Sequence, residues 1–187
     1  MKYCQGPDPE TKTPNFTAPP KACDAHCHVF GPDAKFPFAE GRSYTPPNSP
    51  FEAMQVLQRK LGIERAVIVQ ATCHGTDNTA ALDAIARSED RYKGVAIVDN
   101  SFTDDDFKRL DEGGMRGIRF SFARHIGNAP DFAMVRRITE RVAPLGWHVV
   151  IYMEAPDIVE NADTLADLPL PVVIDHMGRV KTEDGVE

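Results

Sequence analysis

Short runs of apolar residues alternate along the chain with longer segments in which apolar residues recur every three or four positions. The short runs have the length of strands and occupy residues 22–29, 65–70, 94–98, 115–120, 147–153 and 172–175. They are apolar at consecutive rather than alternate positions. This pattern predicts strands that are buried on both faces, as in a parallel sheet.

The longer segments carry the apolar stripes of amphipathic helices. Two stripes are clear, one formed by Phe51, Met54, Leu57 and Leu61 and the other by Val135, Ile138, Val142 and Leu145. A third helix is predicted after Thr103, because three aspartates follow this N-cap candidate and a Gly113-Gly114 pair ends the segment. Helices are therefore expected between successive strands.

Strict alternation of strands and helices predicts an α/β fold with right-handed parallel crossovers. Two architectures fit this order, an open doubly wound sheet and a barrel. No glycine-rich phosphate loop follows any predicted strand, whereas polar residues collect at the carboxyl ends of several strands, where barrel enzymes build their sites. We therefore predict a (β/α)8 TIM-barrel type of fold, with about six of the eight strands in this chain. The barrel domain is expected at residues 21–187, incomplete, after an extended proline-rich arm at residues 1–20.

Composition narrows the possible partners. The net charge of -7 and the isoelectric point near 5.4 argue against nucleic acid, because phosphate binding needs concentrated Lys and Arg. The sequence contains neither the long apolar span of a membrane protein nor the signal peptide of an exported one. The four cysteines form neither a CxxC pair nor a dense framework, which favours the reducing cytoplasm. The oligomeric state stays open.

The candidate chemistry lies at the ends of the predicted strands. His26 and His28 are two positions apart, so both should point to one face of a regular strand. The second strand leads into a loop that holds Thr72 and His74, the fourth delivers Arg119 and then Arg124, the fifth ends in Tyr152 and the sixth in His176. His74 and Arg124 could also be solvated loop residues, and Tyr152 could cap the core with its hydroxyl in water. If Arg119 faces the interior, its guanidinium needs an anionic partner.

Four ordered segments now carry a resemblance to a known family. They are Asp24-Ala25-His26-Cys27-His28-Val29-Phe30-Gly31-Pro32, the loop 70–78, Gly117-Ile118-Arg119-Phe120 and Asp175-His176-Met177-Gly178. The chain resembles the amidohydrolase superfamily over about residues 21–180, and within it the metal-independent hydrolases of 2-pyrone-4,6-dicarboxylate. The resemblance implies opening of a lactone ring that bears two carboxylates, in the catabolism of lignin-derived aromatic compounds. A zinc-dependent lactonase or decarboxylase of the same superfamily, or a catalytically inactive fragment, stays an alternative.

The resemblance also implies roles for individual residues. His26, His28 and His176 would surround and polarise the lactone carbonyl. The substrate carboxylates would be held by Tyr44, Thr72, Arg119, Arg124 and Tyr152. Arg119 and Tyr152 stand where a binuclear centre of the superfamily needs ligands, and arginine is a poor ligand, so no cofactor is expected. One zinc ion held by His26 and His28 is the alternative.

One part of the family pattern is missing. The resemblance implies eight strands and an aspartate general base at the end of the eighth, whereas the chain supplies six. We therefore expect a chain truncated at its C-terminus, or one that closes with a second copy. Glu154 is the best replacement base, because it shares the predicted face of Tyr152, while Asp175 should point away from His176.

Overall fold

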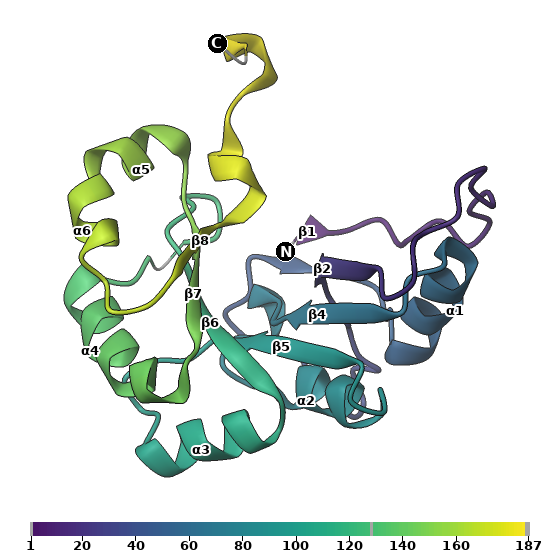
Figure 1. Cartoon of the computed structure of the whole chain (residues 1–187), viewed down its shortest axis with the longest axis horizontal. Coiled ribbons are helices and arrows are strands. Elements are labelled where there is room, and N and C mark those ends of the chain that lie inside the picture. Colours follow the sequence, from purple (N-terminus) through teal and green to yellow (C-terminus); the bar gives the residue numbers. More distant parts are fainter. Residues whose placement is uncertain (1, 128, 186–187) are drawn as a thin grey trace. The chain divides into compact units, whose positions relative to one another are not determined.

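The computed structural model describes residues 2–127 and 129–185 (Figure 1). Its contacts divide the chain into two compact units. The first, here the N-terminal unit, holds residues 1–97 and 109–115, and the second, the C-terminal unit, holds residues 98–108 and 116–187. Helix α3, Asp104–Glu112, runs from one unit into the other. The predicted boundary between residues 20 and 21 stays a prediction.

Three parallel strands form the centre of the N-terminal unit, in the order β2 (Cys23–Cys27), β4 (Arg65–Val69) and β5 (Tyr92–Ala96). A second, short parallel pair joins β1 (Lys2–Tyr3) to β3 (Tyr44–Thr45). The helices of this unit are α1 (Phe51–Leu61), the short 3-10 helix η1 (Thr72–His74) and α2 (Thr79–Ala86).

The buried face of α1 differs from the predicted stripe, of which Met54 and Leu61 are only half-buried. Phe51 and Gln58 are buried, while Leu57 is exposed. The reason is a polar contact inside the unit, because the Tyr92 hydroxyl donates to Gln58 Oε1 over 2.5 Å. A buried amide with a partner can replace leucine on a helix face, and hydrophobic periodicity alone does not reveal it.

Three parallel strands also form the centre of the C-terminal unit, in the order β6 (Met115–Ser121, whose first residue belongs to the other unit), β7 (His148–Tyr152) and β8 (Val172–Ile174). The elements between and after them are α4 (Phe132–Val142), η2 (Ala143–Leu145), α5 (Ala155–Glu160), α6 (Ala162–Ala166), η3 (Asp175–Arg179) and η4 (Thr182–Asp184). All six predicted strands are present, although β5 begins two residues earlier than its apolar run.

Helix α4 confirms most of its predicted stripe. Val135, Ile138 and Val142 are buried, whereas Leu145 is partly exposed because it lies in η2 beyond the end of α4. Asp131 starts the helix by accepting the Met134 backbone N–H at 2.6 Å, a typical N-cap. Among the described residues, no helix is both long and apolar enough to cross a membrane.

Candidate active site

A bulge in β2 sets the position of His26. The strand pairs with β4 in register at Asp24 and again at Cys27, but one extra residue lies between these points. Asp24 Oδ1 accepts the backbone N–H of His26 at 3.1 Å, which satisfies an amide at the irregularity. Bulges often re-aim side chains beside active sites, so the regular alternation that the sequence predicted for this strand does not hold here.

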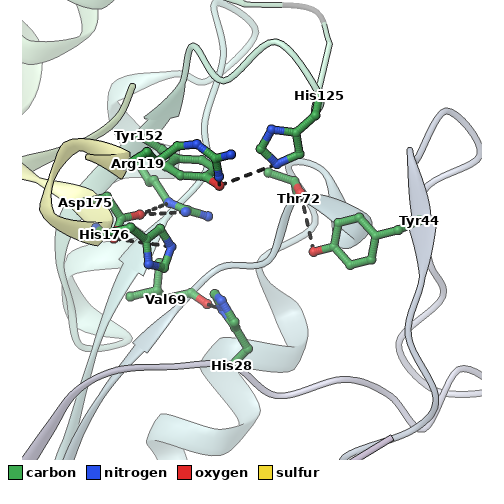
Figure 2. A network of polar contacts seen from close by, with 10 residues as sticks. His28, Tyr44, Val69, Thr72, Arg119, His125, Tyr152, Asp175 and His176 are labelled. Atoms are coloured by element: carbon green, nitrogen blue, oxygen red, sulfur yellow. Dashed lines mark hydrogen bonds and ion pairs between the residues drawn. The ribbon is translucent and has the colours of Figure 1, made fainter. Parts of the chain in front are cut away.

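His28 follows the end of β2, and its ring is held from β4. Nδ1 donates to the carbonyl oxygen of Val69 over 2.7 Å, shown as a dashed line in Figure 2. In the neutral ring this bond places the proton on Nδ1 and leaves Nε2 as the basic nitrogen. The rings of His26 and His28 pack edge to face with centroids 5.0 Å apart, so the two predicted histidines do lie together.

Tyr44 and Thr72 also meet within this unit. The Thr72 hydroxyl lies 3.4 Å from Tyr44 Oη, although Tyr44 belongs to a short strand far away in sequence (Figure 2). Burial raises the pKa of Tyr44 to about 12, so the phenol stays a neutral hydrogen-bond donor at physiological pH. The sequence predicted that both residues bind substrate, and the structure brings the two together.

His74 is a buried residue rather than a solvated one. Only 3 % of its surface is exposed, Nδ1 donates to the Pro37 carbonyl oxygen at 3.2 Å, and the Phe38 ring packs on it. Burial lowers the pKa of His74, so the ring is neutral near pH 7. Gln70 and Asn78 hold the same loop by donating to its backbone carbonyls at Asp77 and Thr76. Much of the polar loop therefore stabilises the fold.

The donor set for a metal can be tested in each unit separately. Zinc sites use three or four His, Cys, Asp or Glu ligands. Within either unit taken alone, the described residues include no group of three such side chains close enough to share an ion. His26 and His28 supply two of the ligands that a zinc ion needs, so one zinc ion held by them stays an alternative.

The C-terminal unit contains a buried ion pair. Arg119, from β6, donates through Nε and Nη2 to Oδ2 of Asp175, at 2.9 and 2.6 Å. Both side chains are about 5 % exposed or less. The predicted need of Arg119 for an anion is thus met inside the protein. The expectation that Asp175 points away from His176 is wrong, because its Oδ1 accepts the His176 backbone N–H and lies 3.7 Å from His176 Nε2.

Tyr152 is the centre of the polar contacts in this unit. The Arg119 guanidinium carbon lies 4.9 Å from the ring centroid of Tyr152, and the His176 ring packs against the same ring at 5.0 Å (Figure 2). The carboxyl ends of β6, β7 and β8 therefore bring three of the predicted site residues together. A cation, a phenol and an imidazole in contact can hold an oxyanion and stabilise developing negative charge.

Arg124 lies apart from this network. Its side chain is 77 % exposed and pairs with Asp157 at 3.1 Å, so its predicted contact with substrate has no support from burial. Sequence reasoning missed His125 and Arg179, which both contact Tyr152 Oη, at 3.4 and 2.5 Å. The sequence signal available for Arg179 was His176, three residues earlier, and no pattern pointed to His125.

Comparison with known proteins gives the family. The amidohydrolase family matches residues 23–186. The chain belongs to the amidohydrolase family. It is 45 % identical over 174 residues to a 2-pyrone-4,6-dicarboxylate hydrolase of Comamonas testosteroni, and the match covers 93 % of this chain and 57 % of that protein. It is 40 % identical over 185 residues to a 4-sulfomuconolactone hydrolase of Rhizobium radiobacter, covering 98 % and 62 %.

A solved structure agrees with this family. The amidohydrolase chain matches a crystal structure of a probable 2-pyrone-4,6-dicarboxylic acid hydrolase from Acinetobacter baumannii with citric acid bound, at a TM-score of 0.78 and 27 % identity. That match covers 88 % of this chain and 61 % of the other. The predicted barrel-type fold with six strands is confirmed. The chain spans about three fifths of the length of the relatives it matches.

Proposed function

We propose that this amidohydrolase opens the lactone ring of 2-pyrone-4,6-dicarboxylate, giving 4-carboxy-2-hydroxymuconate in the catabolism of lignin-derived aromatic compounds. One observation carries the proposal. The ends of β6, β7 and β8 bring Arg119, Tyr152 and His176 together, in a chain that is 45 % identical to a 2-pyrone-4,6-dicarboxylate hydrolase. Water would add to the lactone carbonyl, the ring C–O bond would break, and the product would gain a third carboxylate.

The residue roles follow from what each group can donate. His26, His28 and His176 are proposed to polarise the lactone carbonyl, and the Nδ1 proton of His28 is already committed to Val69. Tyr44, Thr72, Arg119, Arg124 and Tyr152 are proposed to hold the substrate carboxylates. Arg119 keeps Nη1 for this purpose, since its bonds to Asp175 come from Nε and Nη2.

We also propose that the reaction needs no metal. Support comes from the polar network of the C-terminal unit, which is built around guanidinium and phenol groups rather than metal ligands. A cytoplasmic location is proposed as well. All four cysteines are free thiols, as expected in a reducing compartment.

A sulfonated muconolactone is a second candidate substrate. Its support is the 40 % identity to a 4-sulfomuconolactone hydrolase. Carboxylate and sulfonate are both anions that accept hydrogen bonds from arginine and tyrosine, so the polar groups described here fit either.

Calorimetric titration of the purified chain with both lactones tests the proposal. We expect the pyrone dicarboxylate to bind more tightly, and 2-pyrone without carboxylates to bind at least 10-fold more weakly. Tighter binding of the sulfonated lactone would favour the second candidate. Equal binding of the uncharged pyrone would overturn the proposal that the site recognises anions.

A further inference from the structure

Two guanidinium groups lie close to the Tyr152 ring. Arg119 lies over it at 4.9 Å and Arg179 at 5.4 Å, measured from the guanidinium carbon to the ring centroid. The second arginine comes from η3, after β8, and its Nη1 also donates to Tyr152 Oη over 2.5 Å. Neither the sequence pattern nor the proposed function had assigned a role to Arg179.

The two arginines differ in how their charge is balanced. Arg119 is buried and makes two hydrogen bonds to Asp175, at 2.9 and 2.6 Å. Arg179 is 37 % exposed, and the carboxylate that it meets among the described residues is Glu154, whose Oε1 lies 3.9 Å from Nε. That separation is too long for a hydrogen bond. Positive charge in this network is therefore least balanced at Arg179, where solvent and ligands can reach it.

The bond from Arg179 also fixes what Tyr152 can do. Arginine can only donate, so the phenol oxygen accepts here and must direct its own proton elsewhere. His125 Nε2 lies 3.4 Å from the phenol oxygen, which is long for a hydrogen bond from a hydroxyl group. An anionic oxygen that bonded to both Tyr152 and Arg179 would be a better acceptor than His125.

The backbone of η3 takes an unusual course that keeps Arg179 in place. His176, Met177, Gly178 and Arg179 have successive φ values of 49°, 52°, 66° and 53°, all in the left-handed region. Only one of the four is glycine, and the left-handed region is unfavourable for the other three. The turn brings both His176 and Arg179 against Tyr152. Strain of this kind is typical of functional segments.

We infer that Arg179 and Tyr152 together bind one anionic group of the substrate, with Arg179 supplying the charge and turning the phenol into a donor. This inference rests on the proposed function and extends it, because it makes Arg179 a residue that determines specificity for anionic lactones. The group recognised is a carboxylate, or a sulfonate in the same place.

The test compares Arg179→Met and Arg179→Lys with the control Arg136→Met. Arg136 belongs to the same unit, is similarly exposed at 40 %, and makes a surface ion pair with Asp167. Binding of 2-pyrone-4,6-dicarboxylate and of its two monocarboxylates is measured by calorimetry, and KM and kcat wherever turnover is seen. Thermal unfolding checks that each variant is folded.

The Arg179→Met change should raise Kd and KM for the dicarboxylate about 10- to 100-fold with kcat changed less than about threefold, the pattern of a lost binding contact. One monocarboxylate, which lacks the group facing Arg179, should lose little affinity. Lysine should restore part of the loss, and the control should match the unchanged chain.

An unchanged Kd for the dicarboxylate in folded Arg179→Met would overturn the inference and leave the proposed function standing. Binding without turnover that weakens in Arg179→Met would support the inference while contradicting the proposed activity. Failure of the unchanged chain to bind any of the three compounds would overturn both.

Discussion

Breaking the buried ion pair between Arg119 and Asp175 should destabilise the C-terminal unit strongly. The informative change is Asp175→Asn, which keeps the size of the side chain and removes its charge. It leaves the Arg119 guanidinium about 95 % buried with no carboxylate to balance it. Removal of one partner from a buried pair typically costs about 3–5 kcal/mol, mostly because the remaining charge stays out of water.

The structure offers a matched control for this magnitude. Arg124 and Asp157 form an ion pair at 3.1 Å in the same unit, but Arg124 is 77 % exposed. Exposed pairs contribute about 0–1 kcal/mol, so Asp157→Asn should have little effect. The double change Arg119→Met with Asp175→Leu should cost less than the sum of its single changes, because no unpaired charge remains.

The single tryptophan makes the assay specific to this unit. Trp147 is 1 % exposed and directly precedes β7, so its fluorescence reports on unfolding of the C-terminal unit. Urea unfolding followed by this signal should give a loss of about 3–5 kcal/mol for Asp175→Asn and under about 1 kcal/mol for Asp157→Asn. Equal, small losses for both variants would refute the account of Arg119 as a buried charge balanced by Asp175.

Three further predictions follow from burial and backbone geometry. Burial raises the pKa of Cys27 to about 12 and of Cys73 to about 11. A thiol reagent at pH 8 should therefore modify the exposed Cys4 and Cys23 quickly, and Cys27 and Cys73 only after the protein is unfolded. Rapid reaction of all four cysteines in the folded protein would contradict this prediction. Burial lowers the pKa of His74 and His148 in the folded protein, so the unfolded state binds more protons below about pH 6.5. The free energy of unfolding should therefore decrease as the pH is lowered in that range, by up to about 1.4 kcal/mol per pH unit for each histidine. A free energy of unfolding in urea that does not change between pH 7 and 5.5 would count against this prediction. Gly178→Ala should lower the thermal midpoint, because φ is 66° and an added Cβ would lie 2.9 Å from Ile158 Cδ1, and an unchanged midpoint would argue against the left-handed turn.

The strands were predictable from the sequence because a strand that is buried on both faces is a short, continuous run of apolar residues. Each of the six apolar runs became a strand, and polar side chains do follow several of their carboxyl ends. The sequence left open whether Arg119 faces the interior, and the structure buries it. The grouping of Arg119, Tyr152 and His176 was predictable for the same reason, since parallel strands bring their carboxyl ends together.

Other features depend on contacts between distant segments, which no local pattern records. Asp175 was expected to point away from His176 because regular alternation was assumed, but β8 ends at Ile174 and the backbone then turns left-handed. The approach of Arg179 to Tyr152 follows from that turn. His74 was interpreted as either a site residue or a solvated loop residue, and its burial depends on Pro37 and Phe38.

The most direct test of the central claim is turnover of 2-pyrone-4,6-dicarboxylate by the purified chain after treatment with a metal chelator, followed by loss of the pyrone absorbance. The account predicts hydrolysis that the chelator does not abolish and that added zinc does not increase. Hydrolysis that stops with chelator and returns with zinc would contradict the metal-independent mechanism, and binding of the lactone without any turnover would contradict the proposed activity of this chain.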